Sequence, residues 1–220
     1  MARENVSIPC GRISLEGILR VPDGARGPAP AGVICHPHPL FGGSMHNNVT
    51  EALADALSAR GMATLLFNFR GTGRSGGFHG GGISELDDVT SALDFVSGLA
   101  EVDAARMLVA GYSFGCWVGL KAASQDPRPK VLIGVSPPLS MYDFGFLRKE
   151  TRPKLLITGD MDFVCPSSSF LSLVDEIPEP KHGVVLSATD HFHMGRETEL
   201  TDEVIRFLEE FPGWRPVQTE

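Results

Sequence analysis

A serine stands at the centre of the pentapeptide GYSFG at positions 111–115, directly after an apolar run and before a segment that can form a helix. A glycine on each side lets a strand turn sharply into a helix, so that the hydroxyl of Ser113 projects above the sheet. The same turn points the free N–H groups at the helix start toward any oxyanion that forms there. The pattern predicts a nucleophilic serine, with the backbone N–H of Phe114 as one oxyanion donor.

A serine hydroxyl is a weak nucleophile unless a histidine takes its proton and a carboxylate holds that histidine in the required tautomer. Both partners follow later apolar runs: Asp162 comes after the run at 154–159, and His191 comes after the run at 182–188. The order serine, acid, histidine is the one expected when each residue lies on a loop at the carboxyl edge of one sheet. The sequence therefore predicts a Ser113, Asp162, His191 triad that works through an acyl-enzyme.

Each of these two loops also holds a second candidate. Asp160 follows a glycine directly, where an aspartate more often braces its own turn, so Asp162 is preferred as the acid. His191 is preferred as the base because it stands first in its loop, whereas His193 is expected at the surface or behind the reacting groups. His182, near the start of the last apolar run, is expected to be structural.

A second glycine-rich turn, NFRGTGRSGG at 68–77, contains the G-x-G-x-x-G pattern of a dinucleotide-binding turn. Such a turn leads straight into a helix and is followed about 20 residues later by an acidic residue at the end of the next strand. Here FHGGG follows before any helix begins, and the position expected for the acid falls inside that helix. We therefore expect a tight turn beneath a ligand cleft, and no cofactor.

The two motif-bearing turns belong to a regular alternation of short apolar runs with longer segments of helical period. This alternation is typical of an α/β fold in which helices cover both faces of a mostly parallel sheet. About eight strands are expected, at 6–10, 15–21, 31–36, 62–69, 106–112, 130–136, 154–159 and 182–188, the first two as a hairpin-type pair. Helices are expected at 47–61, 84–100, 116–124, 167–177 and 199–211, with Gly61 and Ser84 as caps.

Composition limits the classes of function. A chain of 220 residues with 42% hydrophobic content is long enough for one sizeable core, so we expect a single domain over residues 1–220. The net charge of -8 and the absence of a basic run argue against a nucleic-acid partner. No apolar run is long enough to span a bilayer, and the N-terminal segment lacks an apolar signal region, so we expect no membrane association and a cytoplasmic location.

Neither cysteines nor histidines form a convincing metal or disulfide pattern. The cysteines are far apart and without C-x-x-C pairs, which favours reduced, partly buried thiols. They are Cys10, Cys35, Cys116 and Cys165. The histidine pairs at 36–38 and 191–193 lack a neighbouring set of cysteines or carboxylates, so no metal site is expected.

Five segments carry a resemblance to a known superfamily. They are CHPHPLFGGSMHNN, NFRGTGRSGG, GYSFG, GDMDFVCP and TDHFHMG. In order and spacing they are similar to motifs of the α/β-hydrolase superfamily, which the chain resembles over nearly its whole length. More narrowly, the chain resembles small lidless bacterial hydrolases related to dienelactone hydrolases and to the serine aminopeptidase-like group. The resemblance implies the same triad and an eight-stranded, mostly parallel sheet with its second strand antiparallel.

The chain departs from the dienelactone hydrolases at the nucleophile, where those enzymes carry cysteine and this chain carries Ser113. Cys116, three residues further on, is expected to be packed rather than reactive. The departure puts dienelactone chemistry in doubt and favours ordinary ester hydrolysis.

A second oxyanion donor is expected from the loop at 36–43, as in other hydrolases of this fold. Pro37 and Pro39 have no N–H to donate. Leu40 is therefore the first candidate and His38 the second. The same H-P-H-P segment can also serve as a rigid turn that holds the cleft wall.

The chain between Ser136 and Arg152 is too short for a cap domain, so the site should be open and suited to short acyl chains. Substrate contacts are expected from Phe41, Met141 and Phe144, supported by Leu40 and Phe146. Packing at the sheet edge is an equally good reading of these apolar residues.

Together these features predict a serine hydrolase, acting as a monomer or homodimer, that cleaves small carboxylic esters. A peptidase or a thioesterase would use the same triad, so both remain open. A non-catalytic protein that kept the fold as a ligand pocket is a third alternative.

Overall fold

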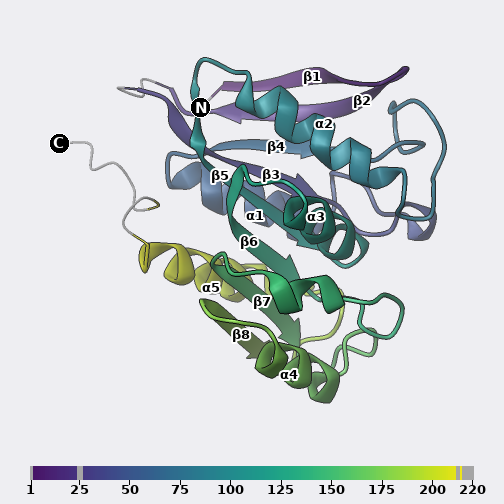
Figure 1. Ribbon diagram of the computed structural model, residues 1–220, viewed down its shortest axis with the longest axis vertical. Helices are drawn as coiled ribbons and strands as arrows, with labels where there is room; N and C mark the ends of the chain where they lie inside the picture. Colours follow the sequence, from purple (N-terminus) through teal and green to yellow (C-terminus); the bar gives the residue numbers. More distant parts are fainter. Residues whose placement is uncertain (1, 24–26, 212–213, 215–220) are drawn as a thin grey trace.

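The computed structural model describes residues 2–23, 27–211 and 214. Its strands form one sheet in the order β1-β2-β4-β3-β5-β6-β7-β8. They are β1 (Ala2–Cys10), β2 (Ile13–Val21), β3 (Ala29–Cys35), β4 (Ala63–Phe67), β5 (Val102–Tyr112), β6 (Pro129–Val135), β7 (Lys154–Gly159) and β8 (Lys181–Leu186). β2 runs antiparallel to both of its neighbours, and the other pairs are parallel (Figure 1). The predicted sheet is confirmed, including its antiparallel second strand and the hairpin of β1 and β2.

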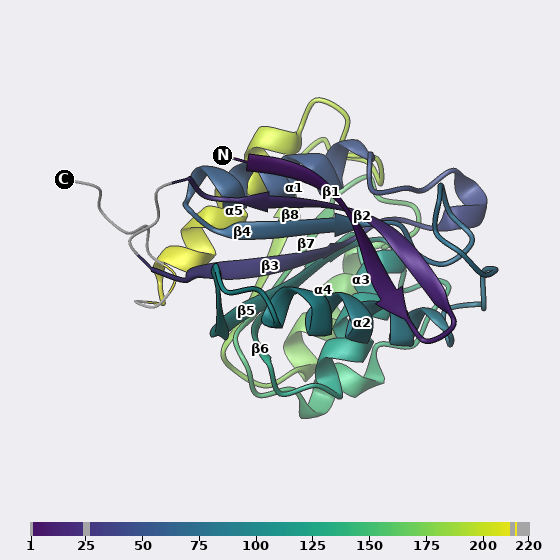
Figure 2. The same ribbon diagram turned by 90° about the horizontal axis from the view of Figure 1, so that it is seen from above.

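Helices cover both faces of this sheet. They are α1 (Asn48–Ala59), α2 (Glu85–Ser97), α3 (Phe114–Ser124), α4 (Ser167–Glu176) and α5 (Glu197–Glu209), with two short 3-10 helices, η1 (Pro39–Phe41) and η2 (Gly145–Lys149). α1 and α5 lie on one face, and α2, α3 and α4 lie on the other (Figure 2). Each face has its own apolar cluster, one around Phe67 and Phe114 and one around Leu66 and Phe207. The strands are therefore buried on both sides, which explains why they appear in the sequence as continuous apolar runs.

The two predicted helix caps have different outcomes. After α1, Gly61 has a φ of 76° and donates its N–H to the carbonyl of Ser58, so that helix ends at a glycine as predicted. Ser84 stands at the N-cap position of α2 as predicted, but its side chain makes no cap hydrogen bond. Instead, N–H groups of the preceding loop donate to the buried carboxylate of Glu85.

Parallel pairing brings the loops that carry chemistry to one edge of the sheet. The loops after β3, β5, β6, β7 and β8 all leave from the carboxyl ends of neighbouring strands (Figure 1). The loop after β3 contains η1, and α3 starts directly after β5 and Ser113. β6 lies between the strands that precede Ser113 and Asp162, which gives the residue after β6 a central position.

The cysteines are buried free thiols. Burial raises the pKa of Cys116 well above its ordinary value, so this thiol stays protonated beside the serine turn. The described residues include no helix that is both long and apolar enough to cross a membrane. Within the same residues, no group of three or more metal-binding side chains is arranged to hold an ion.

Candidate active site

Ser113, His191 and Asp162 meet at the carboxyl edge of the sheet. The Oγ of Ser113 is 3.0 Å from Nε2 of His191, and Nδ1 of His191 is 2.9 Å from each carboxylate oxygen of Asp162. When Nδ1–H donates to the carboxylate, Nε2 carries the lone pair and can accept the serine proton. All three side chains are largely buried, with Ser113 still 8% exposed. The geometry is that of a general base oriented toward a hydroxyl nucleophile.

The turn that holds Ser113 depends on its two flanking glycines. Ser113 has a φ of 54° and a ψ of -119°, a conformation that non-glycine residues seldom adopt. A Cβ on Gly111 would lie 2.2 Å from the carbonyl oxygen of Gly115, and a Cβ on Gly115 would lie 2.3 Å from that of Cys35. A larger residue at either position would therefore force the serine turn away from β3 and β5.

The Asp162 carboxylate is fixed by hydrogen bonds in addition to that from His191. One oxygen accepts the backbone N–H groups of Val164 and Cys165, each at 2.9 Å, and the other accepts the hydroxyl of Thr158 at 3.3 Å. Burial by itself would raise the pKa of this carboxyl, but the hydrogen bond and charge of His191 and the backbone donors hold it below its ordinary value. Asp162 is therefore ionised at neutral pH.

The alternative residues in the two loops lie elsewhere. Asp160 is exposed and accepts the N–H of Thr189 at 3.1 Å, so it ties its loop to the loop after β8 and does not only brace its own turn. His182 is also exposed. His193 is fully buried, and its Nε2 lies 2.8 Å from the Oγ of Ser136. The side chains preferred from the sequence are thus the ones that the structure brings together.

Tyr112, the residue before the nucleophile, also supports the base. Its hydroxyl donates to the backbone carbonyl of His191 at 2.7 Å. Burial raises the pKa of Tyr112, so the hydroxyl remains a donor. No sequence signal pointed to this role, because the bond joins the end of β5 to the loop after β8.

Hydrogen bonds in the loop after β3 distinguish the two candidates for the second oxyanion donor. The N–H of Leu40 donates to Nδ1 of His38 at 3.2 Å, so it is already engaged within the loop. Among the described residues, no hydrogen bond uses the backbone N–H of His38 or that of Phe114. Phe114 is the first residue of α3, where an N–H has no acceptor within the helix. Within the described residues the N–H of His38, the second choice from the sequence, thus has no acceptor, whereas the N–H of Leu40 has one.

His36 connects the loop after β3 to its neighbour through hydrogen bonds. Its side chain is fully buried, with Nδ1 2.6 Å from the carbonyl of Pro37, and its Nε2 accepts the N–H of Phe69 at 3.0 Å. Burial lowers the pKa of His36 to about 4, so the ring is neutral and can both donate and accept. The first histidine of H-P-H thus joins the loop after β3 to the loop after β4.

Two polar side chains of the glycine-rich turn after β4 bond to neighbouring segments of the protein. The Arg70 guanidinium lies 2.7 Å from the buried carboxylate of Asp88, and the Asn68 side chain accepts the N–H of Met45. Phe69 reaches toward the site, with its ring 5.6 Å from that of Phe114.

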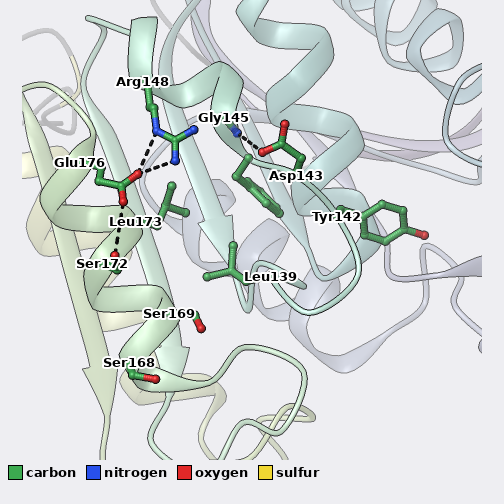
Figure 3. Close-up of a pocket in the computed structure, with 11 residues that line it drawn as sticks. Leu139, Tyr142, Asp143, Gly145, Arg148, Ser168, Ser169, Ser172, Leu173 and Glu176 are labelled. Carbon is green, nitrogen blue, oxygen red and sulfur yellow. Dashed lines mark hydrogen bonds and ion pairs between the residues drawn. The ribbon is translucent and has the colours of Figure 1, made fainter.

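The three side chains predicted to contact substrate differ in exposure. Phe41 is 79% exposed, with its ring 4.7 Å from that of His38, and Met141 is 52% exposed. Phe144 is buried and stacks on Phe146, so most of its side-chain surface is used in packing. It also borders a groove of about 520 Å³ between η2 and α4. Figure 3 shows Tyr142 at one side of this groove and the ion pair of Arg148 and Glu176 at the other.

Known proteins are similar to this chain in sequence and in fold. The family described as serine aminopeptidase, S33, matches residues 29–148. The structure is similar to an α/β serine hydrolase homologue from Coxiella burnetii, with 36% identity, coverage of 94% of this chain and 98% of that chain, and a TM-score of 0.86. It is also similar to a serine hydrolase without lid from Xanthomonas campestris, with 27% identity, coverage of 100% and 98%, and a TM-score of 0.87.

A bacterial protein of unestablished function is also similar to this chain in sequence. An uncharacterized protein of Rickettsia prowazekii is 29% identical over 188 residues, which are 82% of this chain and 79% of that protein. The similarities therefore extend over nearly the whole chain and include relatives of the same size without a lid.

Proposed function

The chain belongs to the serine aminopeptidase S33 family of the α/β-hydrolase superfamily, and from that membership and the site we propose that it cleaves small carboxylic esters. The observation that carries the proposal is the hydrogen-bond chain from Ser113 through His191 to an ionised Asp162. Asp162 is ionised, as its role in orienting His191 requires.

The reaction we propose has two halves. His191 takes the proton of Ser113 at Nε2 while Oγ attacks the ester carbonyl, and the resulting oxyanion is held by the N–H groups of Phe114 and His38. His191 then gives its proton to the departing alcohol, which leaves an acyl-serine. Water, deprotonated by the same nitrogen, attacks the acyl group and releases the acid.

The role of the His38 backbone can be tested with a pair of variants. His38 has a φ of -58°, which proline also adopts, so His38→Pro removes the N–H with little demand on the backbone of residue 38. His38→Ala removes the same ring but keeps the N–H. We expect kcat/KM for a nitrophenyl ester to be about 100-fold lower in His38→Pro than in His38→Ala.

Equal activity of these two variants, with matching circular dichroism spectra, would contradict the assignment and return the role to Leu40. The comparison controls for the loss of the ring, including its contact with the N–H of Leu40, because both variants lack it.

The preference for short acyl chains rests on the open surroundings of Ser113. The segment between β6 and β7 contains only η2 as regular structure, so no inserted helical layer covers the serine. Phe41, in the loop after β3, and Met141, in the loop after β6, present exposed apolar side chains. We propose that these two side chains contact a small acyl or alcohol group without enclosing a long chain.

Nitrophenyl acetate, butyrate and octanoate provide the direct test of this preference. We expect kcat/KM to be highest for the two shorter esters and lowest for octanoate, measured below the concentration at which octanoate aggregates. A coenzyme A thioester and an aminoacyl nitroanilide belong in the same series. Activity on the anilide or the thioester alone would replace ester hydrolysis by the peptidase or thioesterase alternative. Resistance of the folded protein to a fluorophosphonate probe would favour the binding-protein alternative.

A further inference from the structure

Behind the triad, the residue that follows β6 occupies the space between nucleophile and acid. Ser136 is fully buried. Its N–H donates to the carbonyl of Ile157 on β7, and the N–H of Ser113 donates to the carbonyl of Val135, the last residue of β6. Ser136 is thus bonded into the same strand ends that carry Ser113 and Asp162.

The side chain of Ser136 has two partners. Its Oγ lies 2.8 Å from Nε2 of His193. The same hydroxyl interacts with the carboxylate of Asp162 and helps to hold the pKa of that acid below its ordinary value. The second histidine of TDHFHMG is therefore connected to the acid through one serine hydroxyl. These polar contacts form a continuous series from His193 through Ser136, Asp162 and His191 to Ser113.

The direction of these hydrogen bonds follows from the number of protons. Ionised Asp162 can only accept, so the single hydroxyl proton of Ser136 goes to the carboxylate. The Ser136 oxygen must then accept from His193, which places that proton on Nε2. Nδ1 of His193 is the unprotonated nitrogen in this arrangement, and it is the atom that is buried without a hydrogen-bond partner. Burial lowers the pKa of His193 to about 4, which agrees with a neutral ring.

Backbone strain is concentrated in the same residues. Among the described residues, four non-glycine residues have a positive φ, and three of them are Ser113 at 54°, Ser136 at 46° and His193 at 53°. Each such conformation costs on the order of 1–3 kcal/mol and persists only where the surroundings enforce it. The unpartnered Nδ1 adds a further cost. These costs are concentrated in the nucleophile and in two residues that lie behind the acid.

We propose that Ser136 and His193 are positioning residues that hold the Asp162 carboxylate in place and ionised toward His191. The proposal rests on the proposed function, because it assigns a role within that triad. Neither residue touches the substrate in this scheme. Ser136 supplies a hydrogen bond to the acid, and His193 keeps the hydroxyl of Ser136 turned toward it.

The principal test is the pH profile of kcat/KM for Ser136→Ala. We expect kcat to fall about tenfold at pH 8, because a hydrogen bond to a charged group is lost, while KM changes little. We also expect the acid limb to move to higher pH, since a carboxylate with one donor fewer retains a proton within the His191–Asp162 pair more readily. Besides Asp162 and His191, the ionisable groups that act on the pKa of His193 are Asp190 and Glu197. Both are kept in Ser136→Ala.

His193 offers a matched pair of nearly equal size. His193→Gln keeps an N–H near the position of Nε2, whereas His193→Met does not. We expect His193→Gln to retain most of the wild-type rate and His193→Met to reproduce the Ser136→Ala profile. The double variant Ser136→Ala/His193→Met should be no slower than Ser136→Ala, because both changes act through one hydrogen bond. If Ser136→Ala does not fold, the comparison of His193→Gln with His193→Met still tests the proposal.

Titration of active sites with a fluorophosphonate separates the possible failures. A wild-type protein that is neither labelled nor active contradicts the proposed function. A labelled and active wild type whose Ser136→Ala variant has the same rate and acid limb overturns the positioning role. If the two losses in kcat add in the double variant, and the melting temperatures fall, the positioning role is also overturned. Ser136 and His193 would then act only by packing in the core.

Discussion

Ser113→Ala is expected to lower kcat for ester hydrolysis by about 10⁵- to 10⁶-fold while leaving the fold intact, as the removal of a triad nucleophile does in other serine hydrolases. Within the described part of the chain the hydroxyl of Ser113 forms a hydrogen bond with His191 alone, so its removal breaks no other hydrogen bond there. Alanine places the same Cβ in the same left-handed conformation, so backbone strain is unchanged. Rates should be measured with nitrophenyl butyrate, and folding by the melting temperature.

The expected loss is specific to one serine. Ser169→Ala is a suitable control, because Ser169 is exposed on α4 and lines the groove beside η2. It should leave kcat unchanged within about twofold. A fluorophosphonate should label the wild type and the control but not Ser113→Ala. Labelling of Ser113→Ala, or hydrolysis by it at a comparable rate, would show that another group is the nucleophile.

The strands and the triad could be predicted from the sequence because their signals are local. The glycines on both sides of Ser113 are required by contacts of the turn itself, which any residue with a Cβ would violate. Asp162 and His191 each follow an apolar run, and parallel pairing brings such loops to one edge. The antiparallel direction of β2 within a mostly parallel sheet, by contrast, came from the family resemblance and not from periodicity.

The supporting contacts of the site could not be predicted, because they join residues that only the finished sheet brings together. Ser136 is the last residue of the apolar run at 130–136, and nothing in that run indicates a polar role for it. It lies near Asp162 because β6 is placed between β5 and β7. The choice between Leu40 and His38 as second oxyanion donor could not be decided from the sequence for a different reason. It depended on whether the imidazole of His38 takes the N–H of Leu40 within η1, which the residue types alone do not determine.

Asp162→Asn is expected to lower kcat by about 10⁴-fold through the tautomer of His191, as loss of the triad acid does in serine proteases. The backbone N–H groups of Val164 and Cys165 donate to one oxygen of Asp162, so the carbonyl oxygen of the asparagine should occupy that position. The amide NH₂ then takes the other position and donates to Nδ1 of His191. Nε2 must carry the proton in that tautomer, and it can no longer accept the proton of Ser113.

Asp160→Asn is the matched control, since it makes the same chemical change two residues away in the same loop. Asp160 is exposed and contacts the N–H of Thr189, which an asparagine oxygen can also accept. Its kcat should stay within about twofold of the wild type. The reverse result, with Asp160→Asn inactive and Asp162→Asn active, would make Asp160 the acid. If the kcat of Asp162→Asn approaches that of the wild type as pH rises, hydroxide is taking the place of the disabled base. A variant that has lost activity only by misfolding would not recover in this way.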